Sequence, residues 1–462
     1  MCLFSWRKII IPIAMMLLTS MSGVLPAFAG PATRTTDTST LKLISGICPA
    51  LKAPQAPAVP AIPTDKPITL EEAINYALVR HPRIKAAEAN VTISKYQVLQ
   101  AESTFWPIIN FQASKEYFSP DNFLNKSPLS VLSFVGNWTV FDSGRTWYSM
   151  KTSKALEKAV QQDLSTTEQG VAYDVMDAYF NLLKAQSLVN VAQETLDDAN
   201  DHLKQAQAFF DVGVKPKYDV TQADVQVNNA KVQLVQAEDA VTAARINLNT
   251  RLAIDPMSPT NVEDVPELEK LGNTLNGYLQ EALVNRPELI GLQDRLKASQ
   301  MSLRAQVADY LPTFSVQGSY SWNKDANTDL TDSKDVILMV NVPLFNGFLT
   351  TSRVGQARAS VNAAKYTIED TKQNILNQVS QSYLALQDAK ASYVGLQATV
   401  KSARENLDIA QGRYEAGVGA ILDVTDAQVS LTSAEASLAQ AFYNYHLAYS
   451  SLLRSTGKNP KK

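Results

Sequence analysis

Apolar residues recur along most of the chain at alternating steps of three and four, the period of a helix that buries one face. Four long segments follow this pattern, and in each of them one repeating position is mostly alanine while the other is mostly large. One such ladder consists of Val424, Ala427, Leu431, Ala434, Leu438, Ala441, Tyr445, Ala448 and Leu452. Alternating small and large side chains let antiparallel helices approach closely and interdigitate. The pattern therefore predicts paired antiparallel coiled coils.

Two stretches between the helical segments have a period of two, which is typical of a strand with one apolar face. The apolar positions include Leu132, Phe134, Gly136, Trp138 and Val140 in the first stretch, and Phe314, Val316, Gly318, Tyr320 and Trp322 in the second. Each stretch contains two such runs with a polar loop between them. We therefore expect one β-hairpin at about 107–142 and another at about 312–345.

These strands have the length and composition of a membrane sheet. Each is about as long as a tilted strand that crosses a bilayer, and Trp138, Tyr320 and Trp322 suit the membrane interfaces. The alternative, a small soluble sheet that caps the helices, would leave the apolar face uncovered. Four strands cannot close a membrane barrel, because the smallest single-chain barrels have about eight. The strands thus predict an oligomer, and three copies would give a twelve-stranded barrel above a tube of twelve helices.

The sequence contains an internal repeat. The segment ITLEEAINYALVRHPRI at 68–84 resembles NTLNGYLQEALVNRPEL at 273–289, and similar matches continue to the end of the chain. We expect a first repeat at 68–254, a linker at 255–272, a second repeat at 273–457 and a short tail at 458–462. Repetition of the whole body favours one pseudo-symmetric domain, mainly α with a small β part, over several unrelated domains.

Each repeat contains a helical hairpin whose tip is marked by glycine and aspartate. Gly213 and Asp219 in the first tip, at about 211–219, correspond to Gly417 and Asp423 in the second, at about 415–423. Glycine commonly ends a helix and aspartate caps the next one, so Asp219 and Asp423 are expected to cap. No proline interrupts the pattern at 143–211, which predicts a helix on the order of 100 Å long.

The first 67 residues precede the repeats and differ from them in composition. Two positive charges, an apolar run at 9–18 and the sequence Ala27-Phe28-Ala29 predict a secretory signal peptide at 1–29. The alternative of a retained membrane anchor is disfavoured, because the apolar run is shorter than the roughly 20 residues that span a bilayer. The segment at 30–67 is rich in proline and is expected to stay extended. Cys48 would be the lone cysteine after cleavage, which excludes an internal disulfide.

Charge and composition narrow the function. The net charge is −3 and no basic patch suggests nucleic acid as a partner. The three histidines, His81, His202 and His446, lie in helical patterns, and the sequence contains neither a catalytic constellation nor a glycine-rich phosphate loop. The methionines are scattered rather than clustered as soft-metal ligands. We therefore expect no enzyme, no cofactor and no metal site.

The motifs FDSG at 141–144 and LFNG at 344–347, the duplicated helix-strand-strand-helix order and the two glycine-valine tips resemble the TolC-like outer-membrane efflux protein family. The resemblance implies a homotrimer with a transmembrane β-barrel in the lipid of the outer membrane and an α-helical tunnel in the periplasm. Its implied partners are a periplasmic adaptor protein and an inner-membrane transporter of the RND or ABC class. The cargo would be small toxic compounds or secreted proteins, and the sequence leaves both open.

The resemblance also implies site residues at the tips. Asp423 and Asp426 match two acids that ring the pore aperture in the family, and residues three apart share a helix face. Tyr414 and Asp219 match a latch between neighbouring tips. Gly419 stands where the family often has arginine, so the candidates for the basic partner are Lys215, Lys217 and Arg413. The residues expected to dock the adaptor are Val212, Gly213, Val214, Gly417 and Val418.

A soluble periplasmic coiled-coil adaptor or binding protein is the main alternative, since it would also have a signal peptide and helical hairpins. The paired amphipathic strands and the duplication of the whole body favour the channel.

Overall fold

The computed structural model describes residues 66–116, 129–266, 274–324 and 331–458. The expected signal peptide, Cys48, nearly all of the proline-rich segment and all but the first residue of the tail lie outside this part of the chain. So does the last third of the expected linker, from residue 267 onward.

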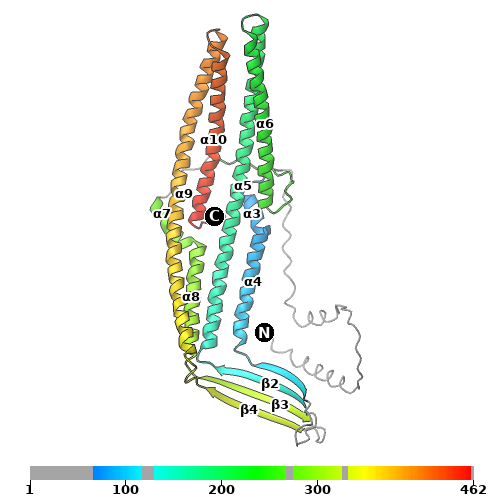
Figure 1. Ribbon diagram of the computed structural model, residues 1–462, viewed down its shortest axis with the longest axis vertical. Helices are drawn as coiled ribbons and strands as arrows, with labels where there is room; N and C mark the ends of the chain where they lie inside the picture. Colours follow the sequence, from blue (N-terminus) through cyan, green and yellow to red (C-terminus); the bar gives the residue numbers. More distant parts are fainter. Residues whose placement is uncertain (1–65, 117–128, 267–273, 325–330, 459–462) are drawn as a thin grey trace, which may run out of the picture. The chain divides into compact units, whose positions relative to one another are not determined.

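The described residues form two copies of one series of elements (Figure 1). The first copy consists of α3 (Leu70–Arg80), α4 (Pro82–Ser103), β1 (Ile108–Glu116), β2 (Leu129–Phe141), α5 (Arg145–Asp211) and α6 (Lys217–Arg251). The second consists of α7 (Leu275–Asn285), α8 (Pro287–Ala308), β3 (Thr313–Lys324), β4 (Thr331–Asn341), α9 (Leu349–Glu415) and α10 (Ile421–Ser455). The mainly helical, duplicated fold expected from the sequence is confirmed.

Short sequence motifs set the helix starts. Thr69 begins α3 with a capping box, in which its hydroxyl accepts from the Glu72 amide and its own amide donates to the Glu72 carboxylate. After each β-hairpin, a side chain of the FDSG or LFNG motif accepts a hydrogen bond from an amide in the first turn of the long helix. Asp142 accepts from the Thr146 amide at 2.7 Å, and Asn346 accepts from the Thr350 amide at 3.4 Å. The two motifs are thus equivalent caps of α5 and α9.

The predicted coiled coils form as two long antiparallel pairs, α5 with α6 and α9 with α10. The second pair buries Leu407, Val424, Leu431 and Ala434 in one core. A larger core lies where α3, α5, α6 and α10 meet, and there Tyr179 donates to the Ile68 carbonyl at 2.9 Å and the Glu263 carbonyl at 2.6 Å. These bonds fasten the start of the body to the segment that joins the repeats. Gly170 lies inside α5 and does not interrupt it.

The strands form one antiparallel sheet in the order β1-β2-β3-β4, so that β2 and β3 join the two repeats and β1 and β4 are its edges. Phe134 pairs with Phe111 on one side and Tyr320 on the other, and Trp138 pairs with Val316. Because paired residues share a face, the apolar positions of all four strands lie on one face. That face is exposed, as Val336 and Leu338 illustrate at 76% and 77%.

The sheet lies at one end of the long helices and the two hairpin tips lie at the other (Figure 1). In the described part of the chain, no helix combines the length and the apolar character that crossing a membrane requires.

Candidate functional site: the paired hairpin tips

The two tips have the same backbone geometry. Gly213 and Gly417 have φ angles of 75° and 78°, a left-handed conformation that glycine adopts without strain. Val214 donates its amide to the Phe209 carbonyl at 2.9 Å, and Val418 donates to the Arg413 carbonyl at 3.0 Å. Each tip therefore closes its helix with the same six-residue motif.

Aspartate does not cap both tips as the sequence suggested. The helices begin at Lys217 and Ile421, which makes Asp219 and Asp423 their third residues rather than the residues before them. Asp423 still accepts from the free Ala420 amide at 3.3 Å. Asp219 makes no capping bond, because the residue equivalent to Ala420 is Pro216, which has no N–H; its buried carboxylate instead accepts from Tyr414. The expectation that Asp219 caps its helix is wrong.

Tyr414, Asp219 and Lys215 come together where the tips meet. The Tyr414 hydroxyl donates to Asp219 Oδ2 at 3.1 Å across the repeats. Lys215 Nζ lies 4.5 Å from the centre of the Tyr414 ring and donates to the Gly419 carbonyl at 3.2 Å. Burial, reinforced by the Asp219 charge, raises the pKa of Tyr414 to about 12, so the hydroxyl keeps its proton at neutral pH. We call these three side chains the tip cluster.

Gly419 lies directly against the end of the preceding helix, α9. A Cβ at this position would lie 2.9 Å from the Tyr414 backbone nitrogen. The equivalent residue of the first tip is Lys215, 204 positions earlier, and it is the residue that reaches the Gly419 carbonyl. Of the three basic candidates, the structure brings Lys215 to the second tip. Lys217 and Arg413 are exposed and form no ion pair with the residues that the structure describes.

A ladder of polar contacts, which the sequence analysis missed, continues from the tip cluster along α5. Its α5 members are Thr195, Asp198, His202 and Gln205, and their partners in α9 and α10 are Thr432, Gln428, Gln411 and Glu415 in that order. The four donor-acceptor distances lie between 3.0 and 3.4 Å. Each α5 member directly precedes an apolar residue of α5 that packs on α6. The polar members therefore follow the same steps of three and four as the apolar ones. This regular polar spacing is visible in the sequence, but it is equally typical of a solvated helix face.

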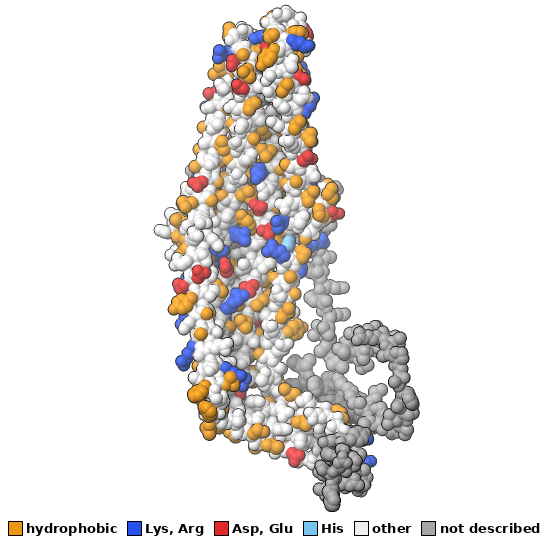
Figure 2. Space-filling view, in the orientation of Figure 1, with side chains coloured by type: hydrophobic (Ala, Val, Ile, Leu, Met, Phe, Trp, Pro, Cys, Tyr) orange, Lys and Arg blue, Asp and Glu red, His pale blue; other side chains and the backbone are white. Residues whose placement is uncertain are grey.

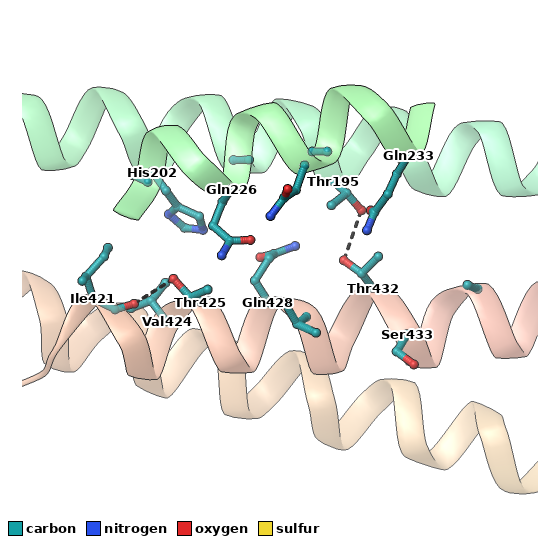
Figure 3. A pocket seen from close by; sticks show the side chains of 16 residues that line it. Thr195, His202, Gln226, Gln233, Ile421, Val424, Thr425, Gln428, Thr432 and Ser433 are labelled. Carbon is teal, nitrogen blue, oxygen red and sulfur yellow. Dashed lines mark hydrogen bonds between the residues drawn. The ribbon is translucent and has the colours of Figure 1, made fainter. Parts of the chain in front are cut away.

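A cavity of about 340 Å³ lies beside this ladder, between α5, α6 and α10. Gln226 and Gln233 from α6 point toward Gln428 and Thr432 from α10 across it (Figure 3). Within each hairpin the buried contacts are mostly apolar, whereas along this ladder the contacts between the hairpins are made by amides, hydroxyls, an imidazole and carboxylates. This stretch of the seam between the hairpins is therefore the weaker one, since polar contacts contribute little net stability.

The remaining predicted residues are on the surface of the single chain. Asp423 and Asp426 are exposed on one face of α10, one turn apart. Val212, Val214 and Val418 are 72%, 64% and 72% exposed beside the two glycines. Figure 2 shows hydrophobic and charged side chains mixed over this end of the molecule.

The order of elements, the sheet with free edges and the paired tips define the fold of outer-membrane channels. The solved outer-membrane channel OprN matches it with a TM-score of 0.75 at 21% identity, over 85% of this chain and 91% of that one. The family model for outer membrane efflux proteins matches residues 73–253 and 278–458, one match for each repeat. The chain therefore belongs to the outer membrane efflux protein family.

Two curated relatives agree with this assignment. The outer membrane efflux protein BepC of Brucella suis is 22% identical over 84% of this chain and 85% of its own length. The outer membrane protein TolC of Escherichia coli is 25% identical over 81% of this chain and 79% of its own. The resemblance inferred from the sequence is confirmed, and with it the outer-membrane location and the class of efflux or secretion channel.

Proposed function

We propose that three copies of this chain form the outer-membrane conduit of a tripartite efflux or type I secretion system. The conduit passes small toxic compounds or proteins from an inner-membrane RND or ABC transporter through the periplasm and the outer membrane. The observation that carries the proposal is the sheet, which has one exposed apolar face and two free edges at one end of helices on the order of 100 Å long.

The free edges support a trimer. Unpaired backbone groups of β1 and β4 would each cost several kcal/mol in lipid, so a membrane sheet must close. Joining β4 of one copy to β1 of the next gives a closed barrel without any change in the strands. Four strands from each of three copies give twelve, an even number within the range of bacterial barrels.

The proposed aperture is formed by Asp423 and Asp426 of each copy. In support, neither carboxylate makes an ion pair with the described residues, and both are exposed in the single chain. Threefold symmetry would bring six carboxylates to one axis, where they would attract cations and repel anions. The tip cluster is the proposed latch, because it joins the second tip to the first and would hold the aperture narrow.

The proposed docking surface for a periplasmic adaptor consists of Val212, Gly213, Val214, Gly417 and Val418. Exposed valines at the extreme end of each hairpin are favourable for an apolar contact, and the left-handed glycines set their positions.

Purification of the full chain from outer-membrane extracts tests the proposal. We expect a trimer that dissociates on heating and that forms cation-selective pores in planar bilayers. Recovery as a monomer in the soluble periplasmic fraction, with no pore activity, would overturn it.

A further inference from the structure

A groove that the proposed function does not use lies between α5 and α8, near the sheet. Its volume is about 370 Å³, and its lining includes Trp147, Lys151, Lys154, Lys158, Lys297 and Arg304. We call it the basic groove. The three α5 lysines are separated by steps of three and four and so share one face of the helix. No acidic side chain lines the groove.

Most of these charges have no acidic partner. Lys154 binds Glu102 at 2.9 Å. Within the described residues, none of Lys151, Lys158, Lys297 and Arg304 forms an ion pair. Lys151 lies 5.1 Å from the centre of the Trp147 ring, and Arg304 lies 6.0 Å from that of Tyr148. Like charges one turn apart destabilise a helix by a few tenths of a kcal/mol per pair, so the groove favours an anion.

The basic groove begins at the end of the helices that meets the sheet. Trp147 is the third residue of α5, and Lys151 is the seventh, about 9 Å along the helix from its start. Arg304 is four residues from the end of α8, about 6 Å. The headgroup layer on each side of a bilayer is about 5 to 8 Å thick. Arg304 and Trp147 therefore lie at headgroup depth when the sheet is in the membrane, and the Lys151 side chain, which leans toward the start of α5, reaches that depth.

Exposed aromatic residues mark the same level. They are Phe105, Trp106, Trp147, Tyr310, Phe345 and Phe348, all from segments where a helix meets the sheet. Aromatic belts of this kind are typical of membrane interfaces. In the face drawn in Figure 2, hydrophobic side chains gather where α9 meets the sheet.

A chain of contacts joins the basic groove to the apolar face of the sheet. Trp138, on that face, donates its indole N–H to the Phe105 carbonyl at 2.9 Å. The Phe105 amide donates to the Glu102 carbonyl at 3.1 Å, and the Glu102 carboxylate binds Lys154. Lys154 of the basic groove is therefore held close to the strand that carries Trp138.

We propose that the basic groove binds the phosphate groups of anionic phospholipids in the membrane leaflet that faces the helices. The proposal rests on the proposed function, because it requires the sheet to be in a membrane. Arg304 offers a planar fork of donors to a phosphate, and the lysines add point charges that extend along the groove. Trp147 contacts the glycerol and the upper acyl chain. The lipid would fix how deeply the sheet sits in the bilayer.

Native mass spectrometry of the full-length protein in neutral detergent tests this, with phosphatidylglycerol as the probe and phosphatidylcholine as its reference. The test variant is Lys151→Gln/Arg304→Gln, which changes the two basic residues nearest the sheet. The matched control, Lys231→Gln/Lys401→Gln, removes two exposed lysines of α6 and α9. Each basic residue near an anionic surface is worth about fivefold in binding, so the test variant should retain phosphatidylglycerol up to roughly twenty-fivefold more weakly. The control and the retention of phosphatidylcholine should not change.

Three results would overturn the proposal. One is equal retention of phosphatidylglycerol by the test variant and the wild type while both are trimeric and form pores, which leaves the proposed function intact. Another is displacement of the lipid by excess inorganic phosphate, which would identify a site for free anions. The third is a change of ion selectivity in the test variant with unchanged lipid retention, which would put the groove in the lumen. Loss of trimers and pores from the wild type would instead refute the proposed function.

Discussion

The first and second hairpin tips share a backbone, yet their equivalent side chains lie in opposite environments. Asp219 is 7% exposed in the first tip, whereas its equivalent Asp423 is on the surface. Tyr414 is 1% exposed in the second tip, whereas its equivalent Phe210 is 38% exposed. The first tip supplies an acceptor and a cation, and the second supplies a hydroxyl and a carbonyl. Duplication thus produced two complementary surfaces from one design, with the acids of the second tip exposed in the single chain.

The largest expected effect comes from Gly417→Pro. Proline requires a φ near −65°, and Gly417 has 78°, so the second tip cannot keep its geometry. We expect export to fall at least about tenfold while the trimer remains assembled, because the substitution is far from the sheet. Export assays combined with heat-dissociation gels measure both.

The matched control for that variant is Ala420→Pro. The equivalent residue of the first tip is Pro216, and Ala420 has an extended backbone with φ −92° and ψ 151°. The substitution removes the exposed hydrogen bond from the Ala420 amide to Asp423, worth about 1 kcal/mol, so near wild-type export is expected. Equal loss in both variants would show that the second tip tolerates no proline, and the role given to Gly417 would be wrong.

Tyr414→Phe is expected to have the next largest effect. It leaves the buried Asp219 carboxylate without its donor, at a cost of about 1 to 3 kcal/mol. Spontaneous conductance of the reconstituted channel should rise by about tenfold, because the latch between the tips is weakened. Tyr366→Phe, which alters an exposed tyrosine of α9, is the control. Unchanged conductance in Tyr414→Phe would show that this hydrogen bond does not contribute to the latch.

The same bond predicts a response to alkaline pH. The pKa of Tyr414 is raised from 10 to about 12, so protonation stabilises the closed tips fully below pH 10. That stabilisation is lost as the pH rises from 10 to about 12. Wild-type conductance should therefore increase in this window, and Tyr414→Phe should show no such increase. A parallel rise in both proteins would assign the response to other groups.

Asp426→Gln makes the second tip resemble the first, where Gln222 is the equivalent residue. It removes three of the six proposed aperture charges in a trimer, so the permeability ratio of cations to anions should fall by about twofold to fivefold. The reverse change, Gln222→Asp, should leave selectivity as it is. Reversal potentials measured in a salt gradient test this prediction. Equal values for Asp426→Gln and wild type would contradict the place of Asp426 in the proposed aperture.

Lys215→Met is expected to have the smallest effect. It removes the cation from the Tyr414 ring and the bond to the Gly419 carbonyl, together worth about 1 kcal/mol. Conductance should rise by about fivefold at most, and Lys217→Met should not change it. If the two variants behave alike, Lys215 has no special part in the latch.

The sequence predicted the periodic parts of this fold because the helix or strand period alone decides which face each side chain is on. The alanine and large-residue ladders predict the coiled coils, and the period-two runs predict both the strands and their shared apolar face. The capping role of Asp219 was predicted wrongly although the sequence held a local signal, since Pro216, three residues earlier, has no N–H to donate. What the sequence could not reveal is that Tyr414, 195 positions later, binds that carboxylate. The polar ladder on α5 was missed for a similar reason. Its partners lie in the other repeat, and polar spacing alone does not distinguish a seam from a solvated face.

The helices of the two repeats are also equal in length, one by one. Both of the short first helices have 11 residues, both second helices 22, both long helices 67 and both return helices 35. The two long hairpins therefore extend the same distance from the sheet. An insertion in one arm alone would move its tip past the other and separate Tyr414 from Asp219. The reach of the protein can therefore change only in matched steps of a heptad in all four long helices, about 10 Å each.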